Sequence, residues 1–327
     1  MKKKVYIVMV VVLSVLVLYV IFYLKQFTFS NQLSFVSEYS LDTPSSRFDY
    51  QAFGDNGLLY LNHMGNDSVI VYDTKTNTIV KEISGIGSPR GIDVSKQYQR
   101  AYVTSPDTDE VVVIDTTTNT ITKKIKVGAD PDGIAVDDDD SRVFLTNESG
   151  ESVSVIDQNT QTEIKQITLT NSVGNTKYDA IHHKVYSAVH DGTFVVIDPV
   201  AMIVEKTIIL NNCDTPHGFA VDEALQQALI SCQGNNIALV VDLATGKELF
   251  RSTVGAGSDV VAFDTADNIG IVSSAAGIAS LFQFGSAPTK LGDQFIAANA
   301  HTVAINPDTH LVYFSIEFGS SIKVYAL

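Results

Sequence analysis

Short stretches of alternating apolar and polar residues recur along the chain, with polar turns between them. The clearest copy is AYVTSPDTDEVVVIDTTTNTITKKIKV, which predicts three strands at Ala101–Ser105, Val111–Asp115 and Ile121–Val127. β-Branched runs with a period of two are typical of strands, and the Pro, Asp and Thr residues between them are typical of turns. The same pattern is written again before this copy, from Leu58, and after it, from Ser141. A repeat of this length indicates the fold class before any other feature does.

The repeat can be counted from the residue that closes its third strand. This residue is Asp in the five best copies, at steps of 42, 42, 41 and 44 residues, and is replaced in two degenerate copies: Asp73, Asp115, Asp157, Asp198, Asp242, Gln283 and Tyr325. Each unit also has a leading apolar strand, such as the run from Gly133 to Asp137. A unit of four strands cannot bury both its faces alone, so the units must pack on one another radially. The sequence therefore predicts an all-β fold, a seven-bladed β-propeller of four-stranded antiparallel blades.

The two ends of the chain predict how the ring closes. The last unit stops after its third strand, Ser321–Ala326, and so lacks one strand. Leu33–Leu41 has the alternation of an outer strand and would complete that blade. This pairing would remove an open sheet edge, which is a site of aggregation. We expect the propeller to occupy 33–327, with 33–41 closing the last blade.

The segment before the propeller predicts a membrane anchor. Residues 1–4 form a basic tail, Val5–Leu24 is a run of 20 residues without charge, and 25–32 form a linker. About 20 apolar residues span a bilayer as one transmembrane helix. The lysines of the tail favour a cytoplasmic N-terminus, which places the propeller on the extracytoplasmic side of the cell membrane. A cleaved signal peptide is the competing interpretation, although no Ala-x-Ala cleavage site stands near Lys25.

The net charge of the chain disfavours two classes of partner. The chain has 22 basic and 37 acidic residues. Without the four lysines at 2–4 and 25, the propeller keeps 18 basic against 37 acidic residues, a net charge of −19. So negative a surface disfavours nucleic acid and anionic lipid. The run Asp137–Asp140 fits a strand-to-strand turn better than a calcium loop, because it lacks the spaced ligands and the Gly of such a loop.

These repeats resemble a known family. Ala-Tyr102-Val103-Thr104 followed by a strand ending in Asp115 resembles the YVTN-motif β-propellers, and 46–327 is similar to their YncE-like branch. The run Arg47-Phe48-Asp49-Tyr50 looks like the first blade of that branch. The resemblance implies a propeller fold and names no activity, because one fold hosts many functions.

Polar residues of both signs gather at one face of the predicted ring. In a four-stranded meander, the loop before the first strand and the loop between the second and third strands lie on the same face. Aligned blades place these residues at the first of these loops: Asp49, Arg90, Asp132, His217, Asp259 and His301. The second loop adds His63, Glu148, His190, Gln233 and Glu317. We call the face that carries the first six residues the mouth and predict that they bind a ligand.

Three functions are compatible with the mouth. His217, His301, Asp132 and Asp259 are suitable metal ligands, but no local spacing motif joins them, and we predict neither a metal nor a cofactor. A His–Asp pair also suits a lyase- or hydrolase-like enzyme that acts on a small molecule, although no hydrolase, zinc-protease or phosphate-loop motif is present. We favour a binding or scaffold module for an unknown small polar ligand or an extracytoplasmic protein. Arg90 and the histidines would suit a polar or anionic molecule, with a pH dependence between roughly 5 and 8 from histidine.

The two cysteines permit a disulfide. Cys213 precedes the first strand of the fifth blade, and Cys232 ends the second strand of the same blade. Both are thus expected on one face of one blade, and an even number of cysteines in an oxidising compartment permits a bridge. Two unpaired thiols are the alternative.

Overall fold

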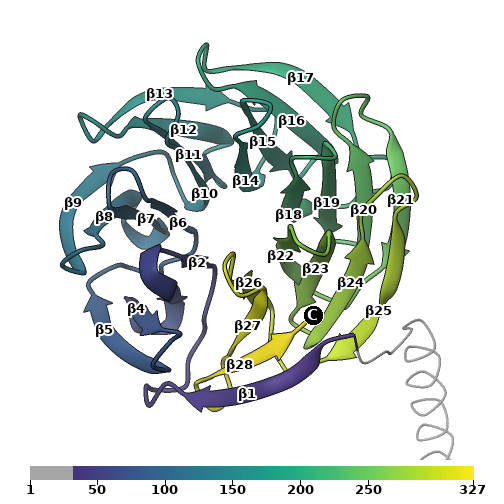
Figure 1. The fold of residues 1–327 in the computed structure, drawn as a ribbon. Helices are drawn as coiled ribbons and strands as arrows, with labels where there is room; N and C mark the ends of the chain where they lie inside the picture. The colour runs from purple at the N-terminus through teal and green to yellow at the C-terminus, as the bar shows by residue number, and fades with distance from the viewer. Residues whose placement is uncertain (1–31) are drawn as a thin grey trace, which may run out of the picture.

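A computed structural model describes residues 32–327, and these residues form a closed ring of seven four-stranded antiparallel sheets (Figure 1). The predicted all-β propeller fold is confirmed. Of residues 32–327, no helix is long and apolar enough to cross a membrane. The predicted tail, the predicted span at 5–24 and nearly all of the predicted linker lie outside the described residues.

The first four blades each contain four consecutive strands. Blade 1 contains β2 (Gln51–Phe53), β3 (Leu58–His63), β4 (Ser68–Asp73) and β5 (Thr78–Ser84). Blade 2 contains β6 (Ile92–Ser95), β7 (Arg100–Ser105), β8 (Glu110–Asp115) and β9 (Thr120–Lys126). Blade 3 contains β10 (Pro131–Asp137), β11 (Arg142–Asn147), β12 (Ser152–Asp157) and β13 (Thr162–Thr168). Blade 4 contains β14 (Val173–Asp179), β15 (Lys184–Val189), β16 (Thr193–Asp198) and β17 (Ile203–Ile209).

The last three blades continue the same order around the ring. Blade 5 contains β18 (Pro216–Asp222), β19 (Gln227–Cys232), β20 (Ile237–Asp242) and β21 (Glu248–Thr253). Blade 6 contains β22 (Ser258–Asp264), β23 (Ile269–Ser274), β24 (Ile278–Gln283) and β25 (Thr289–Phe295). Blade 7 contains β26 (Thr302–Ile305), β27 (Leu311–Ile316), β28 (Ser321–Ala326) and, from the start of the chain, β1 (Ser34–Ser40). Three short 3-10 helices lie in loops of blades 1 and 2: η1 (Asp55–Gly57), η2 (Met64–Asn66) and η3 (Pro106–Thr108).

The burial of each strand follows from its place in the blade. The first strands surround the central channel, and the fourth strands form the outer wall (Figure 1). The second and third strands, such as β7 and β8, are buried almost throughout, because neighbouring blades cover both their faces. The outer strand β9 alternates exposed and partly buried residues, since only one of its faces meets the protein.

The repeated Asp at the end of the third strand has a structural role. Asp115 Oδ1 accepts hydrogen bonds from the backbone N–H groups of Thr117 and Thr118, both at 2.9 Å. These bonds fix the turn into the outer strand. Asp73 and Asp242 accept equivalent bonds in blades 1 and 5. In the degenerate blade 6 the third strand ends with Gln283. Its side-chain amide donates instead to the carbonyls of Asp267 and Asn268, in the turn from β22 to β23.

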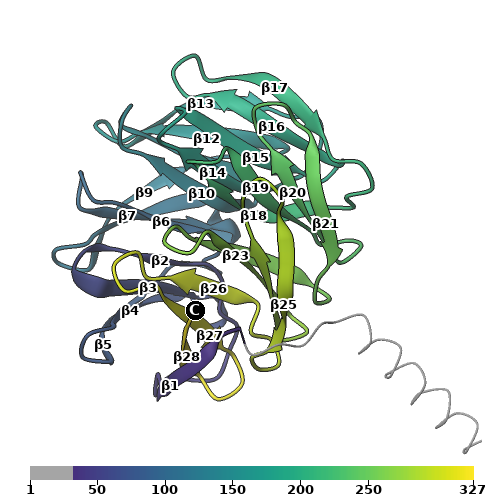
Figure 2. The ribbon, with the colours of Figure 1, turned by 45° about the vertical axis from the view of Figure 1, so that its right-hand side comes forward.

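β1 closes the ring. It pairs antiparallel with β28 from Ser34 opposite Ala326 to Ser40 opposite Ser321, and both views show the two strands side by side (Figures 1 and 2). Leu33 and Leu41, at the two ends of β1, are 2% and 1% exposed. The strand predicted at the start of the chain therefore completes the last blade.

Candidate functional site

A cavity of about 280 Å³ opens at the mouth. Five of the six predicted residues line it together: Asp49, Arg90, Asp132, His217 and Asp259. The sixth, His301, lines an adjoining cavity of about 280 Å³. The two cavities have three residues in common: Arg47, Gln233 and Asp259. The alignment of blades thus predicted which side chains meet at this face.

Close packing of the first strands brings these side chains together. A Cβ atom on Gly218 would lie 1.7 Å from the carbonyl oxygen of Asp259 in the next blade. A Cβ atom on Gly174 would lie 2.7 Å from the Cα atom of His217. Any side chain at either glycine would separate the blades. The glycines therefore set the spacing between neighbouring mouth residues.

His217 lies at the centre of the polar cluster. Its Nε2 atom lies 3.4 Å from Asp259 Oδ1 and 3.6 Å from Asp132 Oδ2. Its Nδ1 atom lies 3.4 Å from Nε2 of His190 in blade 4. Burial, together with the nearby His217, lowers the pKa of His190 to about 4. His190 is therefore neutral near pH 7 and can share one proton with His217.

The guanidinium of Arg90 is already engaged by two carboxylates. Arg90 NH1 lies 3.0 Å from Glu148 Oε2 and 3.1 Å from Asp130 Oδ1. Burial alone would lower the pKa of Arg90, but the carboxylates around it, Asp132 first among them, raise that pKa overall. Arg90 is thus held as a cation that its acidic neighbours neutralise.

Two carboxyl groups at the mouth are deeply buried. Burial raises the pKa of Asp132 to about 6, although His217 and Arg90 oppose the shift. Burial also raises the pKa of Asp49 well above its usual range, and the charges of Asp259 and Asp132 add to the effect. Because each carboxylate disfavours ionisation of the next, the cluster retains protons at a higher pH than isolated carboxyl groups do.

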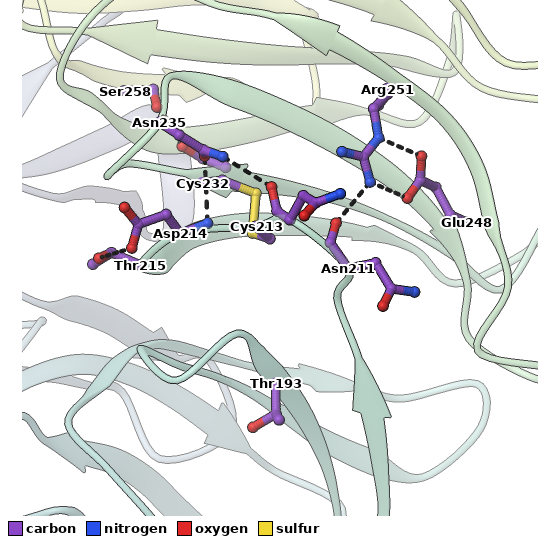
Figure 3. Close-up of a disulfide and its surroundings, with 12 residues drawn as sticks. Thr193, Asn211, Cys213, Asp214, Thr215, Cys232, Asn235, Glu248, Arg251 and Ser258 are labelled. Atoms are coloured by element: carbon purple, nitrogen blue, oxygen red, sulfur yellow. Dashed lines mark hydrogen bonds and ion pairs between the residues drawn. A yellow bond between two sulfur atoms is a disulfide. The ribbon is translucent and has the colours of Figure 1, made fainter.

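The loop that leads to His217 is held from several sides. A disulfide joins Cys213 in this loop to Cys232 at the end of β19, with 5.1 Å between their Cα atoms (Figure 3). The predicted bridge is therefore present. The Asn235 amide donates to the carbonyl of Asn212 at 2.8 Å, and Arg251 donates to the carbonyl of Asn211 at 2.7 Å. These contacts fix the chain just before β18, the strand that presents His217.

His301 belongs to the edge of the site. Its Nδ1 atom lies 3.2 Å from the carbonyl oxygen of Asn299 and 3.7 Å from Glu317 Oε1. It therefore faces blade 7 and the second cavity, while the cluster around His217 occupies the first.

Two residues placed at this face by the blade alignment, His63 and His190, line neither cavity. His63 is 0% exposed and stacks on Phe48 with 4.6 Å between ring centroids. The Ser46 hydroxyl lies 2.7 Å from His63 Nε2. The segment before β2 covers this histidine, which a blade alignment does not reveal because the segment lies outside the repeat.

Arg47 and Tyr50 are among the lining residues that the blade alignment did not predict. Arg47 lines both mouth cavities, and Tyr50 lines the first of them and also a cavity of about 320 Å³ reached from the opposite side. Both belong to the run Arg47-Phe48-Asp49-Tyr50, so the motif of the first blade was the available signal. Within residues 32–327, the grouping of three metal-type donors within 4.8 Å lies on the opposite face rather than at the mouth.

Comparisons with known proteins support the fold and identify a family. The solved structure "Kuenenia stuttgartiensis Hydrazine Synthase" superimposes with a TM-score of 0.77 at 14% identity, covering 88% of this chain and 97% of that one. A chain of "Crystal Structure of Mitotic Checkpoint Complex" gives a TM-score of 0.79 at 10% identity, covering 91% and 94%. At such identities the likeness shows the fold alone. Among curated proteins, none matches significantly.

A family model, described as the choice-of-anchor I domain, matches residues 50–288. The match begins at the first strand of blade 1 and ends before the last strand of blade 6. It therefore covers most of the ring, including four of the six predicted mouth residues. This chain belongs to the choice-of-anchor I domain family.

Proposed function

We propose that this propeller is a binding module that holds a small polar molecule with a positive charge at its mouth. The observation that carries the proposal is the charge of the first cavity. Four carboxylate residues line it, Asp49, Asp132, Glu148 and Asp259, against two arginines, Arg47 and Arg90. Since Arg90 is engaged by Asp130 and Glu148, the anionic ligand considered from the sequence is disfavoured.

The buried carboxyl groups of the first cavity favour a cationic ligand. Asp132, with a pKa of about 6, and Asp49, with its raised pKa, lack enough positive charge around them in the free protein. A bound ammonium group would favour their ionised forms and donate hydrogen bonds to their oxygens. We therefore expect the affinity for a cation to rise between pH 5 and pH 8, as Asp132 loses its proton.

The proposal also includes the cellular location of the protein. We infer a single-pass anchor at residues 5–24 with the propeller outside the cytoplasm. The uncharged run and the disulfide support this location, since disulfides persist in oxidising compartments. Within the propeller class, the motif around Tyr102 favours the YVTN-type, YncE-like branch. An extracytoplasmic protein bound at the same face is the alternative partner.

A thermal-shift screen of the purified full-length chain tests the cation. Putrescine and choline serve as cationic probes, citrate as an anion and glucose as a neutral molecule. We expect a cation to raise the melting temperature of the wild type and not of the Asp132→Asn/Asp259→Asn variant, which removes two carboxylates from the first cavity. The matched control is Asp267→Asn/Asp308→Asn, which removes two exposed carboxylates from turns on the opposite face and should keep the shift.

Two results would contradict the proposal. A shift produced by citrate alone would mean that the arginines, not the carboxylates, select the ligand. A cation shift of equal size in wild type and in the Asp132→Asn/Asp259→Asn variant would place the binding site elsewhere.

A second candidate is a lyase- or hydrolase-like enzyme at the same face. Its support is the arrangement of His217 between Asp132 and Asp259, with neutral His190 behind it. Such a histidine has both a carboxylate partner and a proton acceptor, as a general acid–base group needs. Incubation of a mixture of small metabolites with wild type and with His217→Ala, followed by mass spectrometry, separates the two functions. Consumption of a compound by wild type only would favour the enzyme.

A further inference from the structure

A second polar cluster lies on the face opposite the mouth, between blades 3 and 4. Asp137 and Asp140 belong to the turn from β10 to β11, and His183 belongs to the turn from β14 to β15. One ligand atom of each residue lies within 4.8 Å of the ligand atoms of the other two. The mouth and its ligand do not involve this cluster.

Each residue of this cluster has a buried side-chain atom without a hydrogen-bond partner. These atoms are Asp137 Oδ2, Asp140 Oδ2 and His183 Nε2, and each is shielded from solvent. Asp140 Oδ2 and His183 Nε2 approach to 3.0 Å at an ion-pair contact without hydrogen-bond geometry. Buried polar atoms are almost always satisfied, because an unpaired one loses its hydration without compensation. Their convergence indicates that something absent from the protein chain satisfies them.

Asp137 is the strongest single observation. Its side chain is 0% exposed, and its Oδ1 atom accepts a hydrogen bond from the backbone N–H of Asp140 at 3.0 Å. That bond is the ordinary one for a turn, and the other oxygen, Oδ2, has no hydrogen-bond partner.

The same residue types recur between blades 6 and 7 and provide an internal comparison. There, His310 Nδ1 lies 2.7 Å from Asp264 Oδ1, and the N–H of Asp267 donates to Asp264 Oδ2 at 2.8 Å. Both oxygens of Asp264 are thus satisfied by the protein itself. The equivalent aspartate, Asp137, keeps one oxygen unpaired. Both turns have the same hydrogen bond from a backbone N–H to the aspartate. That bond therefore does not explain the unpaired oxygen between blades 3 and 4.

We propose that Asp137, Asp140 and His183 bind one divalent transition-metal ion, with Zn²⁺ as the best fit. One imidazole nitrogen with two carboxylate oxygens is a zinc-type ligand set, whereas Ca²⁺ and Mg²⁺ prefer oxygen ligands alone. Tetrahedral ligands about 2.1 Å from zinc lie about 3.4 Å from one another. Binding would draw the three ligand atoms, which now lie within 4.8 Å of one another, to that spacing. The fourth position would hold water, and the ion would tie blade 3 to blade 4.

Tyr178 in β14 supports the arrangement from the outside. Its hydroxyl donates to Asp139 Oδ2 at 2.7 Å, and its ring meets that of His183 edge-on at 6.0 Å between centroids. It therefore restrains both the acidic turn and the histidine. Residues that orient metal ligands in this way typically change affinity 10- to 100-fold when they are replaced.

The test measures metal binding by the full-length chain without a polyhistidine tag. The protein is stripped with EDTA, dialysed into metal-free buffer and titrated by calorimetry with Zn²⁺, Mn²⁺ and Ca²⁺ in turn. We expect one equivalent of Zn²⁺, weaker binding of Mn²⁺ and none of Ca²⁺, with a rise in the melting temperature on addition of Zn²⁺. Tyr178→Phe should weaken binding about tenfold. Co²⁺ should give the visible absorption of a tetrahedral site.

Matched histidine variants locate the ion. His183→Ala should abolish Zn²⁺ binding and the gain in melting temperature, while His310→Ala, which removes the equivalent histidine of blade 7, should retain both. If His183→Ala fails to fold, Asp140→Asn provides the same loss of a ligand with less change of shape. Absence of Zn²⁺ binding by wild type would overturn the proposal. Equal binding by wild type and His183→Ala, with loss in His217→Ala, would assign the metal to the mouth instead.

Discussion

At the scale of single residues, buried Asp132 makes the stability of the protein depend on pH. Burial raises its pKa from 3.8 to about 6, so the native state binds its proton more tightly than the unfolded chain does. The favourable contribution is fully present below pH 3.8 and is lost as pH rises through about 6. Two pKa units correspond to roughly 3 kcal/mol. His190, with its pKa lowered to about 4, has the opposite dependence and stabilises the native state as pH rises.

The Asp132→Asn variant isolates the contribution of Asp132. We expect the variant to gain stability relative to wild type by on the order of 2 kcal/mol between pH 4 and pH 8. Urea unfolding at five pH values measures this difference. Asp115→Asn is the control of opposite sign, because hydrogen bonds, that of the Thr117 hydroxyl first, lower the pKa of Asp115. A constant difference between wild type and Asp132→Asn across this range would contradict the buried-carboxylate account.

Single residues also show what a sequence can and cannot predict about a site. The positions of Asp132, His217 and Asp259 followed from their equivalent places in aligned blades, and the ring gathers them. The pairing of His183 with Asp137 was not predictable, because it depends on the distance between turns of neighbouring blades. The sequence correctly indicated a turn at Asp137–Asp140, and the bond from the Asp140 N–H to Asp137 is that turn. The sequence contains no signal that the other oxygen of Asp137 lacks a hydrogen-bond partner.

At the scale of elements, the disulfide of blade 5 connects stability to the mouth. It closes a loop of 19 residues and fixes the segment that leads to His217. Loops of this length contribute ~3 kcal/mol through restriction of the unfolded chain. We expect the Cys213→Ala/Cys232→Ala variant to lose about that much stability and to bind the mouth ligand more weakly. Urea unfolding under oxidising conditions measures the first effect.

Reductant provides the control for the disulfide. It should lower the stability of wild type toward that of the variant and leave the variant unchanged. Two freely alkylated thiols in the non-reduced, exported protein would show that the bridge does not form there.

The closing strand β1 predicts a sharp effect of truncation. Deletion of residues 1–32 leaves β1 intact, and the propeller should fold. Deletion of residues 1–41 removes β1 and both flanking leucines, Leu33 and Leu41, which each contribute roughly 1.5–3 kcal/mol by burial. It also exposes the edge of β28. We expect a lower melting temperature and a smaller unfolding enthalpy for the shorter chain by calorimetry.

Equal melting temperatures and enthalpies of the two truncated chains would mean that β1 does not close the ring. A milder control is Glu38→Ala, which removes the hydrogen bond from the Ser321 hydroxyl to Glu38 at 2.6 Å and the exposed ion pair with Lys323 at 3.9 Å. Because the pairing of β1 with β28 remains, this variant should lose no more than about 1 kcal/mol.

At the scale of the whole molecule, the repeat was sufficient to predict the ring. Five copies carry the same turn Asp, and all seven have apolar second and third strands, so even the two degenerate copies, with Gln283 and Tyr325 in place of that Asp, could be counted. The closure of the ring could also be predicted from the sequence, since the last blade lacked a strand and the start of the chain supplied one. The sequence did not predict that the segment around Phe48 covers His63, because that segment has no counterpart in the other blades.

The prediction that concerns the whole molecule is its attachment to a membrane by residues 5–24. We expect the chain to remain in the membrane fraction after an alkaline wash, with its N-terminal sequence beginning at Met1 or Lys2. Val12→Asp/Val15→Asp should release it, because each Asp at the centre of a span costs roughly 2.5–3.5 kcal/mol. Val80→Asp/Ile209→Asp, which places the same charges at exposed apolar positions of the propeller, should leave the attachment unchanged. A mature protein that starts between Gln26 and Ser34 would instead identify the segment as a cleaved signal peptide, and the propeller would then be released after export.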